Sequence, residues 1–396
     1  MNEELTYLNR SKETFFKDIL RNKHIIESEI SKSRFLIIGG AGSIGSSVAK
    51  QIFSLGARQI DVVDISENYL VELVRDIRSS LGYVTKNFNV YCLDYCSDLF
   101  SQFMDRKKYD YVYNLAALKH VRSEQHFETA LRMIDVNIIA AYNLYKKSLG
   151  VGCKKYFCVS TDKATNPVNL MGATKRTMEL ALFSSDSDTP VSFARFANVL
   201  FSHGSLTENF LTRLSKRQPI SLPSDIERYF ILSSEAGRLC LMSSILGERN
   251  EIFVPKLSEN IKPINFVEIL KSILESQNLK PVWMKSEQDA RESLQHMNLK
   301  KHWPVYTFET DTTGEKYIEE FYAVGSEVDL KRFDEVDVIT SSKPAKFDIK
   351  NFLQDYRNIR NNRVATIDDL ITLISGYVPE FEHKKKNIQI INIYTP

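Results

Sequence analysis

Long hydrophobic runs and a strong excess of charge of one sign are both missing from this sequence of 396 residues. No stretch approaches the ~18 to 20 apolar residues of a transmembrane helix, and charged residues interrupt the N-terminal segment throughout, unlike a secretory signal. The formal net charge of +2 gives no reason to expect binding to nucleic acid or to an anionic membrane. We therefore expect a cytoplasmic protein without a membrane span.

Cysteine is also scarce. The five cysteines are an odd number and mostly sit in apolar runs, which favours buried thiols in a reducing compartment over a disulfide framework. Cys92 and Cys96 have no companion pair at the spacing of a zinc site, so we expect no metal centre. The rest of the composition, 43% hydrophobic and 26% charged, is typical of a soluble globular chain. The length predicts two or three structural units.

Strands and helices alternate from Arg34 onward. Longer stretches between the apolar runs predict helices, among them 66–80, 124–149 and 171–182. Short apolar runs predict strands at 35–38, 60–63, 90–93, 111–115, 156–159 and 191–196. This alternation predicts an α/β fold with a Rossmann-type doubly wound parallel sheet. After about residue 200 the pattern changes to polar turns and short elements, which indicates a smaller C-terminal lobe.

A glycine-rich turn with the spacing G-x-x-G-x-x-G follows the first predicted strand. Glycines there let the backbone approach a pyrophosphate, which rests on the N-terminus of the next helix. Asp64 ends the second strand, 19 positions after the last glycine, and is placed to accept the ribose hydroxyls of a dinucleotide. A carboxylate there repels a 2′-phosphate, so NAD is favoured over NADP. The residues expected to contact the cofactor in this turn are Gly39, Gly42, Ser43, Ile44 and Gly45.

The stretch 160–177, STDKATNPVNLMGATKRT, holds the densest group of reactive side chains. An apolar run delivers Ser160, Thr161, Asp162 and Lys163 to the carboxyl end of a strand, which is where ligands lie in open α/β sheets. A turn follows, and then a helix that carries Lys175. Two hydroxyls, a carboxylate and two amines should therefore converge at this edge. A surface ion pair between Asp162 and Lys163 is the plainer alternative.

This stretch resembles the active site of extended short-chain dehydrogenase/reductases, in which a Ser or Thr is followed by Tyr-x-x-x-Lys. Here Met171 stands at the tyrosine position, and methionine cannot exchange a proton. The resemblance narrows to the polysaccharide-biosynthesis branch of nucleotide-sugar 4,6-dehydratases, chiefly UDP-N-acetylglucosamine 4,6-dehydratases, and covers roughly residues 34–325. The segments that carry it are NLAALKHV (114–121), STDKATNPVNLMGATKR (160–176), RFANVL (195–200), ERYFI (227–231) and TGEKYIEEF (313–321).

The resemblance implies a dehydration in which NAD takes a hydride from C4 of the sugar and returns it to C6. We expect Lys163 to be the base at C5, its pKa lowered by apolar surroundings, and Asp162 the acid toward the C6 hydroxyl. The reverse assignment stays open. Thr161 or Ser160 should hydrogen-bond the 4-hydroxyl, whose proton leaves through Asp162 or a water because Met171 cannot take it.

Further roles follow from the resemblance alone. Lys175 should bind the nicotinamide ribose, with Ser160 nearby. Ala116 and Ala117 should pass the cofactor closely, and Asp94 should lie beside the adenine, with a helix N-cap as its alternative role. The substrate contacts should be Lys119, His120, Asn198, Ser205, Arg228 and Glu315, although Thr312 and Thr313 replace the Arg-Pro of the family's R-P-G-E-K motif.

The expected units are an N-terminal extension of one or two amphipathic helices (1–31), an NAD-binding Rossmann domain (32–200), a substrate-binding lobe with segments that return to the sheet (201–334) and a C-terminal appendage (335–396). Homodimerisation through helices 124–149 and 170–183, or a higher homo-oligomer, is implied by the resemblance. Other functions that the sequence leaves open are a C5-inverting version of the dehydratase, a nucleotide-sugar 4-epimerase, and a cofactor-binding scaffold without catalysis.

Overall fold

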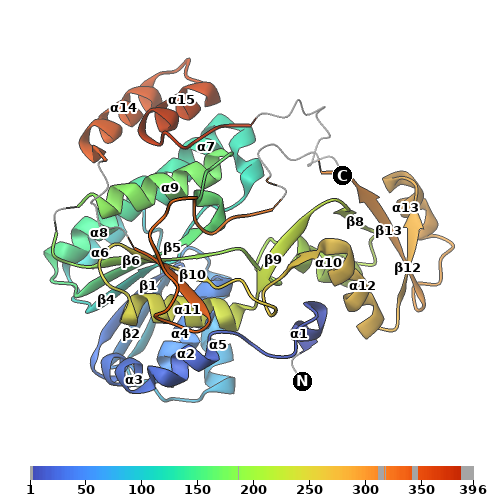
Figure 1. Ribbon diagram of the computed structural model, residues 1–396, viewed down its shortest axis with the longest axis horizontal. Coiled ribbons are helices and arrows are strands. Elements are labelled where there is room, and N and C mark those ends of the chain that lie inside the picture. Colours follow the sequence, from blue (N-terminus) through green and yellow to red (C-terminus); the bar gives the residue numbers. More distant parts are fainter. Residues whose placement is uncertain (1–2, 186, 311–315, 317, 341–346, 385–396) are drawn as a thin grey trace.

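The computed structural model describes residues 3–185, 187–310, 316, 318–340 and 347–384. Within these residues, nine strands form one sheet in the order β14-β15-β10-β6-β5-β4-β1-β2-β3 (Figure 1). The strands from β10 to β3 pair in parallel, whereas β15 is antiparallel to both of its neighbours, β10 and β14. The bounds are β1 Arg34–Ile38, β2 Gln59–Asp64, β3 Phe88–Cys92, β4 Tyr111–Asn114, β5 Lys155–Thr161, β6 Val191–Phe196, β10 Glu251–Pro255, β14 Val328–Asp329 and β15 Val336–Ile339. The predicted α/β fold with a doubly wound parallel sheet is confirmed.

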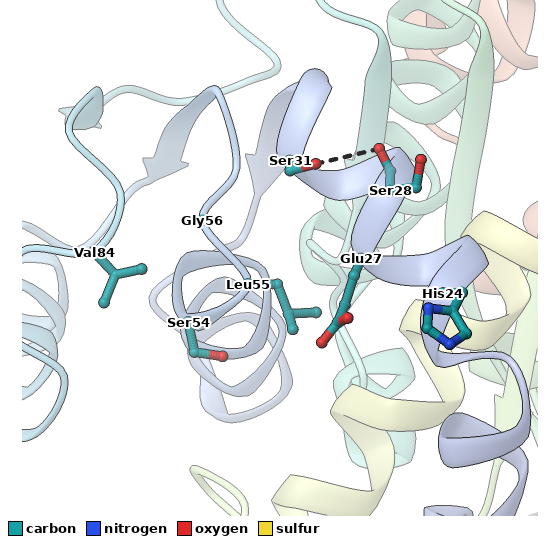
Figure 2. Close-up of a pocket in the computed structure, with 8 residues that line it drawn as sticks. All are labelled: His24, Glu27, Ser28, Ser31, Ser54, Leu55, Gly56 and Val84. Atoms are coloured by element: carbon teal, nitrogen blue, oxygen red, sulfur yellow. Dashed lines mark hydrogen bonds between the residues drawn. The ribbon is translucent and has the colours of Figure 1, made fainter.

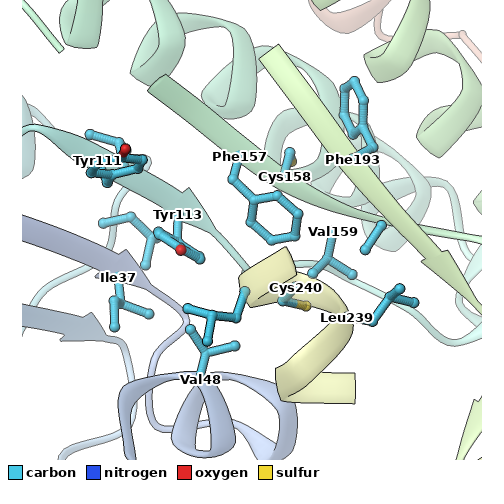
Figure 3. Close-up of a cluster of buried hydrophobic side chains, with 14 of the residues drawn as sticks. Ile37, Val48, Tyr111, Tyr113, Phe157, Cys158, Val159, Phe193, Leu239 and Cys240 are labelled. Atoms are coloured by element: carbon cyan, nitrogen blue, oxygen red, sulfur yellow. The ribbon is translucent and has the colours of Figure 1, made fainter. Parts of the chain in front are cut away.

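The parallel strands are apolar runs because helices cover both faces of the sheet. The helices α4, α5 and α11 lie on one face, and α6, α8 and α9 lie on the other (Figure 1). Figure 3 shows the core under α4 and α11, where Ile37, Val48, Phe157 and Leu239 meet. The helix bounds are α4 Ser43–Ser54, α5 Glu67–Ser80, α6 Asp98–Asp105, α8 Ala141–Gly150, α9 Leu170–Phe183 and α11 Ser233–Leu246.

The predicted helix 124–149 is interrupted. A 3-10 turn, η1 (Val121–Gln125), is followed by α7 (Phe127–Ile134), a π-helical turn, η2 (Asp135–Ala140), and then α8. Asn137 lies in the π turn. Its Oδ1 accepts a hydrogen bond from the Leu118 N–H at 3.0 Å, and its Nδ2 donates to the Leu118 carbonyl oxygen and to Thr174 Oγ1, both at 3.0 Å. The wider turn therefore places an amide that ties the loop after β4 to α9.

The second lobe is built on two small sheets, β12-β13-β8 and β11-β9-β7. Its apolar cluster also takes in Leu5 and Leu8 from the N-terminal segment, which packs on α12 through α1. The segment has three short helices where we expected one or two. The bounds are α1 Glu3–Tyr7, α2 Phe16–Arg21, α3 Lys23–Lys32, α10 Leu206–Ser215, α12 Phe266–Ser276, α13 Glu287–Ser293, β7 Asn198–Val199, β8 Ile220–Pro223, β9 Glu227–Ile231, β11 Pro263–Asn265, β12 Lys280–Met284 and β13 His302–Phe308.

The C-terminal helices α14 (Ile349–Asn361) and α15 (Ile367–Tyr377) lie against α7 and α9 (Figure 1). Their apolar residues form one buried cluster with residues of α7, η2 and α9, including Phe352 and Ile374 on one side and Ile134 and Ala173 on the other. The chain itself therefore covers an apolar face of the two helices that we expected to form a homodimer. A dimer through that face would have to displace α14 and α15.

Candidate functional site

Two adjoining elements bring the predicted reactive residues together. Strand β5 ends at Thr161, and the next three residues form a single 3-10 turn, η3 (Asp162–Ala164), which lies against the first turn of α9. Gly172 makes this contact possible, because a Cβ atom at that position would lie 2.2 Å from the Lys163 carbonyl oxygen. Asn169 caps α9 by accepting a hydrogen bond from the Gly172 N–H at 2.8 Å. The helix that carries Met171 and Lys175 is thus fixed against Asp162 and Lys163.

Asp162 is fully buried and lies next to the Lys163 ammonium. Its Oδ1 accepts hydrogen bonds from Thr161 Oγ1 at 2.7 Å, from the Lys163 N–H at 2.8 Å and from Lys163 Nζ at 3.3 Å. Its Oδ2 is also buried but has no hydrogen-bond partner among the described residues. Asp162 and Lys163 do form an ion pair, but the alternative that this pair lies on the surface is wrong, because the Asp162 carboxylate has 0% exposure.

A third charged group of this cluster, Glu319, was missed in the sequence. Its Oε1 lies 3.3 Å from Lys163 Nζ, and its Oε2 is buried without a hydrogen-bond partner in the part of the chain that the structure describes. Burial and the nearby Asp162 raise the pKa of Glu319, although Lys163 opposes the shift. Glu319 belongs to the segment TGEKYIEEF that carried part of the resemblance, but nothing in that segment indicates which of its acidic residues turns inward.

The two carboxylates correct one of our expectations about Lys163. We expected apolar surroundings to lower its pKa. Burial does act in that direction, but Asp162 and Glu319 outweigh it, and the pKa of Lys163 is raised above its usual value. Arg228 on β9 is buried and close enough to Lys163 and Glu319 to influence both pKa values. Lys163 therefore stays an ammonium ion at neutral pH.

Lys175 and Met171 lie on the buried side of α9. The Lys175 ammonium contacts Met178 Sδ at 3.9 Å and has no oxygen acceptor among the described residues. Burial lowers the pKa of Lys175, an effect that Cys158 and Glu179 partly offset. Met171 is 4% exposed. A buried amine without an oxygen partner is what a position for binding ribose hydroxyls requires.

Ser160 points into a different buried network. Its hydroxyl donates to Glu179 Oε1 at 2.6 Å, and Arg195 Nε donates to the same oxygen at 2.7 Å. Arg176 and a second Arg195 nitrogen bond the other Glu179 oxygen. Burial alone would raise the pKa of Glu179, but Arg195, Arg176 and Ser160 lower it. The Ser160 hydroxyl thus belongs to the network that links β5 to β6 through Glu179, while the Thr161 hydroxyl lies with Asp162.

The glycine turn has the shape that a pyrophosphate needs. Gly39 has φ +70°, and a Cβ there would lie 2.7 Å from the Ala116 nitrogen; a Cβ at Gly45 would lie 2.1 Å from the Gly39 oxygen. At Gly42, the N-cap of α4, the nearest atom to such a Cβ is the Gly39 oxygen at 3.4 Å. Packing thus explains the first and last glycines, and the middle one leaves open space beside a helix N-terminus. These residues fit a bound dinucleotide.

The other predicted cofactor residues surround this turn. Asp64 accepts hydrogen bonds from the Ala41 N–H at 3.1 Å and from the Ser66 N–H at 3.0 Å, so it holds the turn in place. Ser43 accepts a hydrogen bond from the His203 N–H at 2.8 Å, and Ile44 packs on the core. Ala117 is exposed and lies next to Ala116.

Asp94 lies beyond the end of β3 and is not a helix cap. Its carboxylate accepts hydrogen bonds from the Cys96 N–H at 2.9 Å and from Arg132 at 2.9 Å. The N-cap of α6 is Ser97, whose hydroxyl accepts from the Phe100 N–H at 3.2 Å. The N-cap alternative for Asp94 is wrong because a serine three residues later has the required position.

The predicted substrate residues come from both lobes. Lys119 and His120 are exposed after β4, and Lys119 reaches Ser202 Oγ at 3.4 Å. Asn198 has a buried Nδ2 without a hydrogen-bond partner among the described residues. Ser205 caps α10 by accepting a hydrogen bond from the Glu208 N–H at 3.1 Å. Glu315 lies outside the described residues, as do Thr312 and Thr313.

Two surface hollows lie in different parts of the fold, and of these two only the second adjoins the reactive residues. Figure 2 shows one of about 510 Å³ beside α3 and the end of α4, lined by residues such as His24, Glu27 and Leu55. It lies at the amino ends of the parallel strands, away from the reactive residues. A second hollow of about 410 Å³ is lined by Thr165, Asn166 and Arg195, directly after the η3 turn.

The sheet order, the glycine turn and the β5–α9 contact define a Rossmann-type doubly wound fold. A family model described as "Polysaccharide biosynthesis protein" matches residues 35–294, more than half of the sequence. The chain belongs to this family.

Relatives share this region at moderate identity. An uncharacterized membrane protein, MJ1061, of Methanocaldococcus jannaschii is 32% identical over 56% of this chain and 66% of its own length. CapD, a capsular polysaccharide biosynthesis protein of Staphylococcus aureus, is 30% identical over 63% of this chain and 42% of its own length. A UDP-N-acetylglucosamine 4,6-dehydratase (inverting) of Campylobacter jejuni is 28% identical over 56% and 66%. The chain thus spans less than two thirds of each relative.

Solved structures support the fold. Pen from Bacillus thuringiensis aligns with a TM-score of 0.64 at 21% identity and covers 88% of this chain and 98% of its own. WbmF from Bordetella bronchiseptica, solved with NAD+ and UDP, aligns with a TM-score of 0.52 at 19% identity, covering 63% and 78%. In the part of this chain that the structure describes, no helix is both long and apolar enough to cross a membrane.

Proposed function

We propose that this protein is an enzyme that catalyses the NAD-dependent 4,6-dehydration of a nucleotide-activated N-acetylhexosamine, most directly UDP-N-acetylglucosamine, for the synthesis of a surface polysaccharide or glycan. Membership of the family, the names of the C. jejuni relatives and the ligands of WbmF support it. The observation that carries the proposal is the pair of buried carboxylates, Asp162 and Glu319, on either side of Lys163. They lie beside α9, which carries Lys175 and has Met171 in place of a tyrosine.

The glycine turn and Ser43 would hold the pyrophosphate of the dinucleotide, Asp64 the adenosine ribose and Lys175 the nicotinamide ribose. When bound, the cofactor supplies a hydride acceptor that takes hydride from C4 of the sugar and returns it at C6. The open space at Gly42 and the Lys175 ammonium without an oxygen partner support this placement. The carboxylate of Asp64 favours NAD over NADP.

The chain's own residues supply the proton transfers. Thr161 is placed to hydrogen-bond the 4-hydroxyl, whose proton leaves to Asp162 or to a water, since Met171 cannot accept it. Once C4 is a ketone, the C5 hydrogen is acidic, and the elimination of water needs one base at C5 and one acid at the C6 hydroxyl. Asp162 and Lys163, 3.3 Å apart, provide one carboxylate and one ammonium for these two tasks.

Substrate binding is assigned to polar groups around this edge. The unpaired Asn198 Nδ2 and the cation of Arg228 suit the acceptor oxygens of a nucleotide diphosphate sugar. Lys119, His120 and Ser205 lie on the loops after β4 and β7, which contact each other. Glu315 is assigned to substrate binding from the sequence alone. A homo-oligomer remains part of the proposal, but through a surface other than the one that α14 and α15 cover.

The experiment is incubation of the full chain with UDP-N-acetylglucosamine, followed by mass spectrometry and NMR. The proposal predicts a 4-keto product lighter by one water. A C4-inverted sugar of unchanged mass would instead identify a 4-epimerase, and no conversion would identify a scaffold.

A C5-inverting dehydratase is the second candidate, because the C. jejuni relatives carry "inverting" in their names. The configuration at C5 of the product, read by NMR, separates it from the retaining enzyme.

A further inference from the structure

The carboxylate of Glu319 reaches the reactive turn from a distant part of the sequence, and backbone contacts hold it there. Lys316 Nζ donates to the Thr165 carbonyl oxygen at 2.6 Å. The Phe321 carbonyl oxygen accepts from Thr165 Oγ1 at 3.0 Å and from Arg195 Nη1 at 3.1 Å. Glu319 therefore lies on a segment tied at both sides to the residues that follow β5, and its position next to Lys163 is built into the fold.

Lys163 Nζ lies between two negative charges. Asp162 Oδ1 and Glu319 Oε1 each lie 3.3 Å from it, and the side chains of both acids are at most 2% exposed. The cations of Arg228 and Lys316 also influence the pKa values in this cluster. Loss of the Lys163 proton would leave two buried carboxylates close together, which is costly in a poorly solvated site. The geometry thus favours the charged ammonium.

Each acid also has one oxygen to spare. Asp162 Oδ2 and Glu319 Oε2 are buried and have no hydrogen-bond partner among the described residues. A buried acceptor left unpaired destabilises the fold, so such atoms persist mainly where a ligand or a proton completes them. On Asp162 this is the oxygen available to take a proton from carbon.

We propose that Glu319 is a positioning residue that holds Lys163 between two carboxylates, so that Lys163 enters the elimination as the acid and Asp162 as the base. This inference rests on the proposed dehydration. Asp162 takes the C5 proton, the C5–H electron pair forms the C5–C6 double bond, the C6–O bond breaks, and Lys163 Nζ protonates the departing hydroxyl to give water. Because Asp162 must be a carboxylate at this step, the 4-hydroxyl proton leaves through water.

The test is the pH dependence of kcat for wild type, Glu319→Gln and Glu319→Asp. An acid works only while protonated, so activity is lost as pH rises through the pKa of Lys163. Removal of one carboxylate lowers that pKa, and the alkaline limb of Glu319→Gln therefore moves to lower pH. We expect kcat to fall about 10- to 100-fold, with KM within about twofold of wild type. Glu319→Asp keeps the charge and should restore part of kcat and the position of the limb.

Glu320→Gln is the matched control. Glu320 is the next residue, its side chain is 55% exposed, and it contacts Lys316 and Asn166. It should keep the wild-type kcat and alkaline limb. If wild type is active and Glu319→Gln has the same pH profile as wild type, this inference is overturned but the proposed function is not. A wild type that releases no water overturns the proposed function and this inference with it. If Glu319→Gln does not fold, Glu319→Asp becomes the test. Its shorter side chain draws the carboxylate away from Lys163 Nζ, so kcat should fall below that of wild type, and an unchanged kcat contradicts the inference.

Discussion

Two buried charged clusters lie within three residues of each other at the end of β5, and they differ in how completely their polar atoms are paired. Around Glu179, both carboxylate oxygens accept two hydrogen bonds, from Ser160, Arg176 and Arg195. Around Lys163, the carboxylates of Asp162 and Glu319 each keep one buried oxygen without a partner in the described chain. The carboxylates are buried in both clusters, but only those of the second cluster have an oxygen that lacks a hydrogen bond among the described residues.

The difference fits the proposed function, in which the Glu179 cluster supports the fold and the Asp162 cluster meets the ligand. A fully paired buried network stiffens its surroundings and leaves no group to react. A cluster with spare acceptors can take a hydrogen bond or a proton from a bound molecule, as the proposed function requires. Ser160 and Thr161 were alternatives for the 4-hydroxyl contact in the sequence, and this comparison favours Thr161, because only its hydroxyl lies with Asp162.

The largest expected effect is on Asp162. Asp162→Asn keeps the size and the acceptor oxygen of the side chain but removes the base, so kcat should fall about 10²- to 10⁴-fold. The melting temperature should change little, because the hydrogen bonds from Thr161 and the Lys163 N–H can persist. Steady-state kinetics and a thermal unfolding curve on the same preparation check both parts. Retained turnover would refute the assignment of the base.

The opposite pattern is expected at the paired cluster. Glu179→Gln leaves the buried Arg195 cation without a counter-charge, and the free energy of unfolding should fall by about 3–5 kcal/mol. Denaturant unfolding measures this loss. A stable Glu179→Gln variant would contradict the view that this network supports the fold.

The same residue predicts a pH dependence of stability. The folded-state pKa of Glu179 is lowered by Arg195, Arg176 and Ser160 from an ordinary value of 4.5, so its contribution is present above that value and is lost as pH falls through the folded pKa. Wild-type stability should therefore decline on acidification below that ordinary value. In Glu179→Gln this part of the decline should be absent, as urea unfolding at a series of pH values can show.

The smallest effect is expected for Met171→Tyr. Because the proton transfers are assigned to the Asp162 cluster, a phenol at this buried position should change kcat by less than about tenfold. Kinetic comparison with wild type is the measurement. A native chain without activity that gains dehydration on this substitution would show that the phenol is indispensable.

The sequence allowed the local features to be predicted, and the long-range ones were missed. The strand positions, the glycine turn and the stretch 160–177 are continuous patterns, so the edge where Asp162, Lys163 and Lys175 meet could be inferred. Glu319 comes from far along the chain, on a segment where Thr165 and Phe321, 156 positions apart, are hydrogen-bonded. Without that contact the pKa of Lys163 was judged from burial alone, and its direction was wrong.

The C-terminal helices show the same limit on a larger scale. Their amphipathic pattern predicts that one face is buried but does not say against what. The apolar face of α7 and α9 was equally open to a partner subunit or to the chain itself, and Phe352 and Ile374 occupy it.

The most direct test of the central claim, that a carboxylate and an ammonium ion at the end of β5 perform the elimination without a phenol, is turnover of UDP-N-acetylglucosamine by the full chain in D2O. The account predicts a product that has lost one water and carries one deuterium at C5, with Asp162→Asn forming neither. A product lighter by one water that Asp162→Asn forms at the wild-type rate would contradict it.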